Sequence, residues 1–266
     1  MIETTTRRDV PAKAFVRTYD NPSYADPWDA IEDYERVQRA AARHPEKGSS
    51  ALSRIVDLPR GRIRSWVDAE GMPDAYRGLQ VALDRGWLHP NPNSSAGRAL
   101  VELSAHIVAG GSINDNYVPA VSVGRRVSAD EIETTFRTLG VESVERHADS
   151  ENRATEILPA DDASVLGRCL VALGIPHGSK QEMTSLPHVV HTVSRLHRTL
   201  FATTYARHRA VEYETKSTIR IAEERPQEYL ESLGELFRDV TGERVAVGIR
   251  GLTLSADAAR DLGLAE

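Results

Sequence analysis

The sequence predicts an α+β protein with an all-helical N-terminal domain followed by a mixed domain of helices and strands. Only helical periodicity occurs in residues 26–88, and a Pro- and Asn-rich linker follows at 89–97. Strand patterns begin after this linker, in a domain spanning 98–266. There the expected order of helices and strands occurs twice, in 98–176 and again in 186–264.

Composition indicates a folded protein of two domains. The chain has 266 residues, of which 40 % are hydrophobic and 27 % charged. A single cysteine, Cys169, excludes an intrachain disulfide and a cysteine-rich zinc cluster. We find no apolar run of membrane-spanning length and no apolar core of a signal peptide at the N-terminus. We therefore expect a cytoplasmic protein with no membrane partner.

The charge balance indicates a habitat rather than a partner. Of 33 basic residues only four are lysines, and the formal net charge is −6. Scarce lysine with an acidic excess is typical of a GC-rich genome or a salt-adapted host, such as a halophilic archaeon. An acidic total leaves nucleic-acid binding open, because phosphate contacts need only a locally basic face.

The N-terminal domain begins after residues 1–25, which we expect to be a flexible arm. Asp26 is placed to cap a helix that Pro27 opens and that runs to about His44. Further helices are expected over 51–55, 60–67 and 73–86.

The centre of this domain reads helix, three-residue break, helix, which is the helix-turn-helix arrangement. Arg60 and Arg64 are four residues apart on the second helix and project from one outward face, while Arg62 lies on another part of the exposed surface. Arginines on such a helix reach guanine edges or phosphates in a major groove. The alternative is a small helical bundle whose exposed face carries arginine.

In the second domain the expected elements alternate. The first copy has helices at 99–110, 128–139 and 161–173 and strands at 117–123, 141–147 and 153–158, with a further very short strand near 112–113. The second copy has helices at 186–206, 226–240 and 255–262 and strands at 210–213, 217–222, 244–249 and 252–254. Ser128 with Glu131 matches a capping box, and Ser255 is placed to cap the last helix.

The segment Leu103–Ile113 resembles the LAGLIDADG helix of homing endonucleases, and 173–187 is similar to the stretch between their two repeats. Residues 196–205 stand in the place of the second motif helix. The resemblance covers about 98–264. It implies a pseudo-twofold saddle of two sheets over the DNA major groove, with the motif helices side by side. Small residues would form the repeat interface: Ala105, Ala109, Gly111, Thr199, Ala202 and Thr203.

The sequence departs from that family where the chemistry occurs. In active members an acidic residue at the foot of each motif helix binds the divalent metals that cleave the phosphodiester. The corresponding positions here are Gly110 and Thr204, and neither carries a carboxylate. The resemblance therefore implies a degenerate domain without catalytic residues, metal or cofactor. Asp115, on the following turn, leaves open an endonuclease with a shifted active site.

The run 109–115 is also similar to bacterial WhiA-type regulators, which join a degenerate LAGLIDADG domain to a helix-turn-helix domain and act in transcription. Their helix-turn-helix lies at the other end of the chain, so the similarity lies in the kinds of domain and not in the order of the domains.

Basic residues are concentrated in the second copy. Lys216, Thr218 and Arg220 share one face of the expected strand, and Arg207 and Arg209 are expected to share another. Such a row suits DNA phosphates, and the alternative is a solvated face of mixed charge.

Histidines at 188 and 191 lack a zinc pattern, and we expect them to be solvated or capping residues. Together these features predict a sequence-specific DNA-binding protein, a transcription regulator associated with the nucleoid. Its expected partners are double-stranded DNA, the transcription machinery and a second copy of the chain. The alternatives are a metal-dependent homing endonuclease and a protein-interaction or sensing module.

Overall fold

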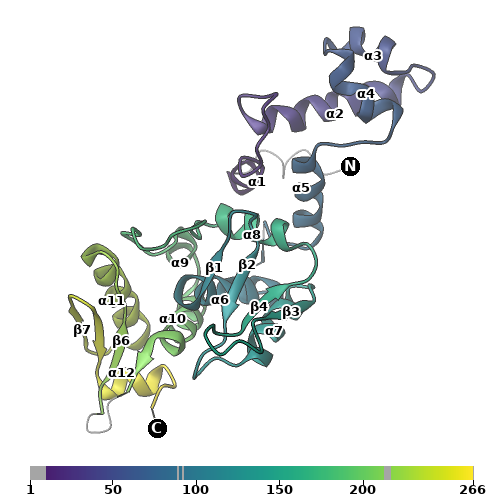
Figure 1. Ribbon diagram of the computed structural model, residues 1–266. Helices are drawn as coiled ribbons and strands as arrows, with labels where there is room; N and C mark the ends of the chain where they lie inside the picture. Colours follow the sequence, from purple (N-terminus) through teal and green to yellow (C-terminus); the bar gives the residue numbers. More distant parts are fainter. Residues whose placement is uncertain (1–9, 89, 92, 213–216, 266) are drawn as a thin grey trace. The chain divides into compact units, whose positions relative to one another are not determined.

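The computed structural model describes residues 10–88, 90–91, 93–212 and 217–265. The chain divides into two compact units, Met1–Asp84 and Arg85–Glu266 (Figure 1). The described part of the first unit is helical, and the second contains two antiparallel four-stranded sheets with helices. The α+β class is therefore confirmed.

The first unit begins with a helix that the sequence did not predict. Part of the expected flexible arm, Val10–Val16, forms α1, and its side chains Phe15 and Val16 are buried. This helix packs against α5, where Gly78 leaves room for the ring of Tyr19. The arm was mispredicted because α1 has only seven residues, too few to show a helical period.

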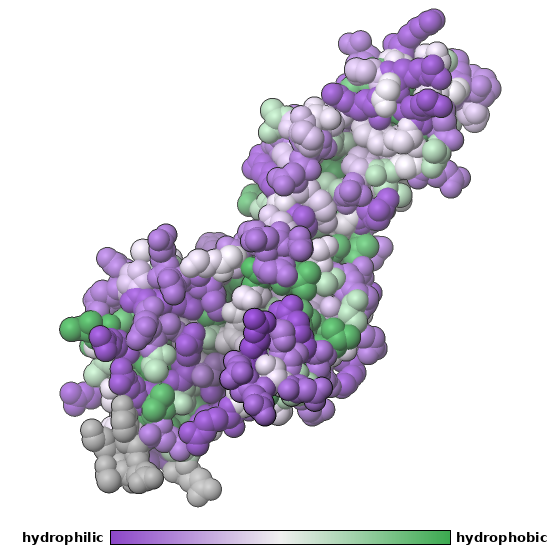
Figure 2. All heavy atoms as spheres, viewed as in Figure 1, coloured by the Kyte–Doolittle hydropathy of each residue, from purple (hydrophilic) through white to green (hydrophobic). Residues whose placement is uncertain are grey.

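Four further helices follow: α2 (Pro27–Arg43), α3 (Ser49–Val56), α4 (Arg60–Asp68) and α5 (Asp74–Asp84). Asp26 caps α2 as predicted, because its carboxylate accepts a hydrogen bond of 3.1 Å from the Trp28 backbone N–H. The drawn face of this unit is mostly hydrophilic (Figure 2), so its apolar side chains must pack inside.

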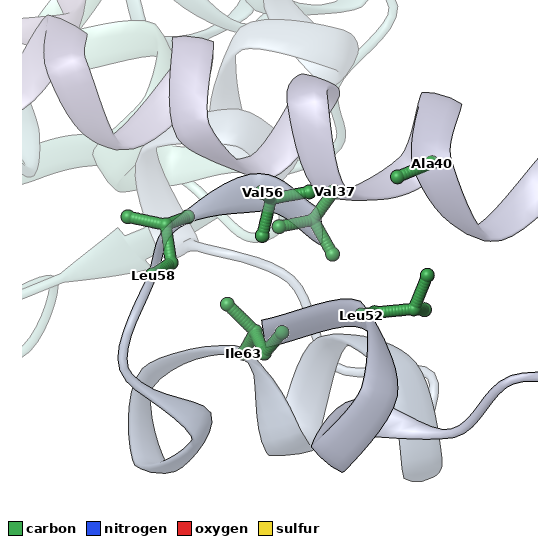
Figure 3. Close-up of a cluster of buried hydrophobic side chains, with 6 residues drawn as sticks. All are labelled: Val37, Ala40, Leu52, Val56, Leu58 and Ile63. Atoms are coloured by element: carbon green, nitrogen blue, oxygen red, sulfur yellow. The ribbon is translucent and has the colours of Figure 1, made fainter. Parts of the chain in front are cut away.

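The apolar core of α2, α3 and α4 is one cluster of six side chains (Figure 3). It contains Val37 and Ala40 from α2, Leu52 and Val56 from α3, Leu58 from the link, and Ile63 from α4. Leu52 and Ile63 are fully buried. At about 2 kcal/mol for each fully buried aliphatic side chain, this cluster fixes the angle between α3 and α4.

The link between α3 and α4 is a tight turn. Asp57 adopts the left-handed conformation with φ 52°, and the Leu58 N–H donates to the Ser53 carbonyl at 3.1 Å. The Ser53 hydroxyl donates back to the Leu58 carbonyl at 2.6 Å. From the end of α4, Asp68 accepts bonds from the backbone N–H and the hydroxyl of Ser49, so it caps α3 in place of Gly48.

The second unit starts earlier than the expected boundary at 88. Arg85 forms an ion pair of 2.8 Å with Asp162, and Trp87 is fully buried with its indole N–H on the Leu139 carbonyl. Burying the large indole of Trp87 in the second unit stabilises the fold more than leaving it exposed in a linker would. The expected linker also ends early, because Ser94 caps a helix that starts at Ser95. Residues 89 and 92 of the linker lie outside the described residues.

The first sheet of this unit has the strand order β1-β2-β4-β3. Its strands are β1 (Gly111–Ile113), β2 (Pro119–Ser122), β3 (Ser143–Arg146) and β4 (Glu156–Pro159), so the predicted very short strand exists. The helices of this copy are α6 (Ser95–Gly110), α7 (Ala129–Thr138) and α8 (Ala163–Ala172). Ser128 caps α7 through the Glu131 N–H.

The second sheet has the equivalent order β5-β6-β8-β7. Its strands are β5 (Ala210–Val211), β6 (Ile219–Ala222), β7 (Val245–Gly248) and β8 (Gly251–Leu254). The helices are α10 (Arg195–Arg209), α11 (Gln227–Thr241) and α12 (Ala256–Asp261), and Ser255 caps α12 as predicted. The expected repetition of element order is thus present in both copies.

One expected helix is two. The predicted span 186–206 contains α9 (His188–Thr192) and α10, separated by an extended Val193 and Ser194. The apolar positions continue across this break, so their spacing alone did not reveal it. α10 then runs to Arg209, and it packs along α6 between the two sheets (Figure 1).

Candidate nucleic-acid interface

An outward row of side chains crosses the second sheet. On β6, Ile219 and Ile221 are buried while Arg220 is on the opposite face. Arg220 lies opposite Thr253 of β8, which in turn lies opposite Ala246 of β7. Thr218 is half-buried beside the strand, and Lys216 lies outside the described residues. Val211 of β5 lies opposite Arg220 on its other side and is 42 % exposed, so the described part of this face presents one guanidinium among small and apolar residues.

A hollow of about 550 Å³ adjoins this row and is strongly cationic. Five of its lining residues are basic: Lys180, Arg209, Arg220, Arg225 and Arg250. Only Glu223 and Glu224 among the lining residues are acidic. Arg250 is exposed in the β7–β8 turn, and its carbonyl accepts a 3.0 Å hydrogen bond from Arg220. In a protein with a net charge of −6, this is a local excess of positive charge suited to an anion.

A buried carboxylate holds two of these arginines in place. Glu223 is 4 % exposed and lies 3.3 Å from Arg225 Nε and 3.5 Å from Arg209 Nε. The Tyr205 hydroxyl also donates to Glu223, and burial raises the pKa of Tyr205 well above its ordinary value. Tyr205 therefore stays protonated, so the carboxylate keeps its hydrogen bond and its two cationic partners.

The foot of α6 is capped by two side-chain cations from this hollow. Lys180 Nζ donates to the carbonyls of Ile107 at 2.6 Å, Val108 at 3.1 Å and Gly111. Arg225 Nη2 donates to the same Val108 carbonyl at 2.6 Å. Cations at this end complement the partial negative charge of the last helical carbonyls.

Burial and the neighbouring Arg225 and Arg209 lower the pKa of Lys180 to about 7. The three carbonyls act in the other direction, because only the ammonium form can donate to all of them at once.

Arg207 and Arg209 do not share a face, which corrects the expectation. Both lie in the last turn of α10 rather than on a strand, so two residues of spacing turns them to different sides. Arg207 is ion-paired with Glu131 of α7, where Nη2 lies 2.8 Å from Oε2, and it also donates to the Arg126 carbonyl. Arg209 lines the hollow, and Arg207 does not.

The arginines of α4 also divide into exposed side chains and one that is bound within its own unit. Arg60 and Arg64 are exposed, as predicted, and Arg60 Nε donates to the Ser49 hydroxyl at 3.4 Å. Arg62 lies on another part of the surface, as expected, but its side chain is half-buried. Its guanidinium lies 4.6 Å from the centre of the Tyr24 ring and 4.0 Å from Asp33, so it binds its own unit.

The expected repeat interface lies on α6 and α10, except at one residue. Ala105, Ala109 and Ala202 are buried, and Thr199 and Thr203 are half-buried. Gly111 instead faces β2, where a Cβ would come within 2.3 Å of the Ala120 carbonyl. Gly110 is the glycine that faces α10, because a Cβ there would lie 2.2 Å from His208 Nδ1.

At the two positions where active family members carry a metal-binding carboxylate, the residues of this chain serve helix packing. Gly110 accommodates His208, and Thr204 is buried in α10. Asp115 is exposed in the β1–β2 turn.

The sequence places Arg225 in the basic region of the second copy, but it did not assign Lys180, Arg225 or Arg250 to the expected DNA-binding residues. They lie on three separate connections, and no local pattern brings them together. The one feature of the sequence that could have drawn attention to this site is Lys180, because the chain has only four lysines.

Comparison with known proteins adds no identification, because no family model matches the chain and no curated protein is significantly similar to it. None of the helices within the described ranges is both long and apolar enough to cross a bilayer.

Proposed function

We propose that the chain binds double-stranded DNA in a sequence-specific manner, as a transcription regulator, and does not cleave it. The observation that carries this proposal is the group of five basic side chains around one hollow, beside an open sheet face. Double-stranded DNA carries one negative charge for about every 1.7 Å of its axis, and arginine binds its phosphates in a bidentate manner.

The N-terminal unit supplies the sequence-reading part of this proposal. The tight turn at Asp57-Leu58-Pro59, the buried Leu58 and the angle held by the six-residue cluster are what a helix-turn-helix requires. In this interpretation α3 supports and α4 is the recognition helix, with Arg60 and Arg64 toward base edges.

The second unit is proposed to be a degenerate LAGLIDADG-like pseudo-dimer. Two sheets of equivalent strand order, with α6 and α10 packed together between them, support this proposal. The proposed lack of cleavage rests on the foot of α6, where Lys180 and Arg225 bring positive charge to the helix end. These cations repel Mg²⁺ and attract phosphate.

The test is the salt dependence of DNA binding by the full chain, measured by fluorescence anisotropy on duplexes enriched from a random library. We expect the double variant Arg220→Gln/Arg250→Gln to reduce the slope of log K against log salt by about 1.8, or 0.9 for each lost phosphate contact. The matched control is Arg137→Gln, an exposed arginine on α7 that lies on no sheet face, and we expect it to leave the slope unchanged.

An unchanged slope in the double variant would remove the second unit from the DNA interface. Failure of the library to enrich any sequence would refute sequence-specific recognition. Mg²⁺-dependent cleavage that Asp115→Ala abolishes would replace the regulator with an endonuclease.

A further inference from the structure

A separate group of ligand-bearing side chains lies where α6 meets α7. One nitrogen of His106 and one carboxylate oxygen from each of Glu102 and Glu131 are all within 4.8 Å of one another. Glu102 and His106 are four residues apart on α6, so both project from one side of that helix. Glu131 comes from the first turn of α7. None of the three lines the cationic hollow described above.

His106 carries an unused ligand atom. The side chain is fully buried, and its Nδ1 lies 2.8 Å from His208 Nε2 of α10. Its Nε2 has no hydrogen-bond partner in the described part of the chain. A buried polar atom without a partner costs about 1–3 kcal/mol, which a bound ion would remove.

The surroundings of His106 favour the form that binds a metal. The 2.8 Å contact between His106 Nδ1 and His208 Nε2 can hold the ring proton on Nδ1, which leaves the Nε2 lone pair for an ion. Metal-bound histidines commonly donate their other ring N–H to an acceptor, and His208 Nε2 is in position to accept it.

The carboxylates are partly buried but reachable. Both line a hollow of about 470 Å³, whose lining also includes Ser95 and Thr138. Glu131 already has a cationic partner in Arg207.

From this geometry we propose that Glu102, His106 and Glu131 form a binding site for a divalent first-row transition-metal ion such as Zn²⁺, with the remaining coordination open to water. One imidazole and two carboxylates suit such an ion better than Mg²⁺, which prefers ligand sets made of oxygen alone. The site ties α6 to α7 and does not depend on DNA binding. Arg207 competes with the ion for Glu131.

The experiment is titration of the full, untagged chain with Co²⁺, followed by its visible d–d absorption, and competition by Zn²⁺ and Mg²⁺. We expect one ion per chain, displacement by Zn²⁺ and no displacement by Mg²⁺. Glu102→Gln is expected to weaken binding at least about tenfold. The matched control, Asp130→Asn, changes an exposed carboxylate that lines the same hollow and is expected to leave binding unchanged.

Arg207, which competes with the ion for Glu131, allows a variant that should strengthen metal binding instead of weakening it. Arg207→Gln frees Glu131, and we expect it to tighten Co²⁺ binding. Binding that is equal in the wild type and in Glu102→Gln would overturn the proposal. The same holds for binding that is lost in His188→Ala, since His188 and His191 are exposed and three residues apart on another helix.

A measurement on the wild type covers the case in which Glu102→Gln fails to fold. In NMR spectra, Mn²⁺ at the proposed site would broaden the ring signals of His106 and His208 strongly and leave those of His188 and His191 sharp. Broadening of the exposed pair alone would refute the site.

Discussion

The hydrogen-bonded pair His106–His208 makes a testable prediction about acid stability. Burial is the main cause that lowers the pKa of His106 to about 3 and that of His208 to about 4. The cations Arg207, Arg209 and Lys180 depress the pKa of His208 further. In the unfolded chain both rings return to about 6.5.

The sign and the size follow from proton linkage. Below pH 6.5 the unfolded state binds protons that the folded state does not, so the free energy of unfolding decreases as the pH falls. Each histidine contributes a slope of about 1.4 kcal/mol per pH unit between its folded pKa and 6.5, so the pair contributes about 2.7. The contribution of His208 is complete near pH 4, and that of His106 continues to about pH 3.

The assay is urea unfolding of the full chain between pH 4.5 and 7.5, followed by the fluorescence of Trp87. Substituting Trp28 and Trp66 by phenylalanine leaves this buried indole as the reporter of the second unit. Other groups also titrate in this range, so the informative quantity is the difference between two variants. His208→Gln, made in the same background, is expected to reduce the slope by about 1.4 kcal/mol per pH unit. Parallel pH profiles would refute the buried neutral pair.

Two further predictions concern single side chains. Gly110→Ala places a Cβ against the ring of His208 and should destabilise the second unit by about 1–3 kcal/mol, whereas Gly61→Ala, with open space, should be neutral or stabilising in chemical denaturation. Arg64→Ala should cost about 1–3 kcal/mol at the specific DNA site without lowering the melting temperature, and Arg62→Ala should lower the melting temperature of the first unit. The reverse pattern for the two arginines would contradict their assignment.

The sequence by itself determined the order of the elements. Caps and periodicity are local, so Asp26, Ser128 and Ser255 mark helix starts as predicted, and both copies of the repeated order were expected. Elements shorter than two helical turns, such as α1, lack the length to show a period. The break between α9 and α10 was missed because apolar spacing continues through it.

Only the tertiary structure decided which charged groups are available. Glu131 is the acidic member of the predicted capping box, yet its carboxylate binds Arg207 of a helix distant in sequence. Arg62 and Arg64 look alike in sequence, but one stacks on Tyr24 and the other is exposed. Ion pairs between residues far apart in the chain depend on how helices and sheets pack, and local pattern carries no information about that packing. For the same reason the cationic hollow and the Glu102–His106–Glu131 group became visible only when the chain was folded.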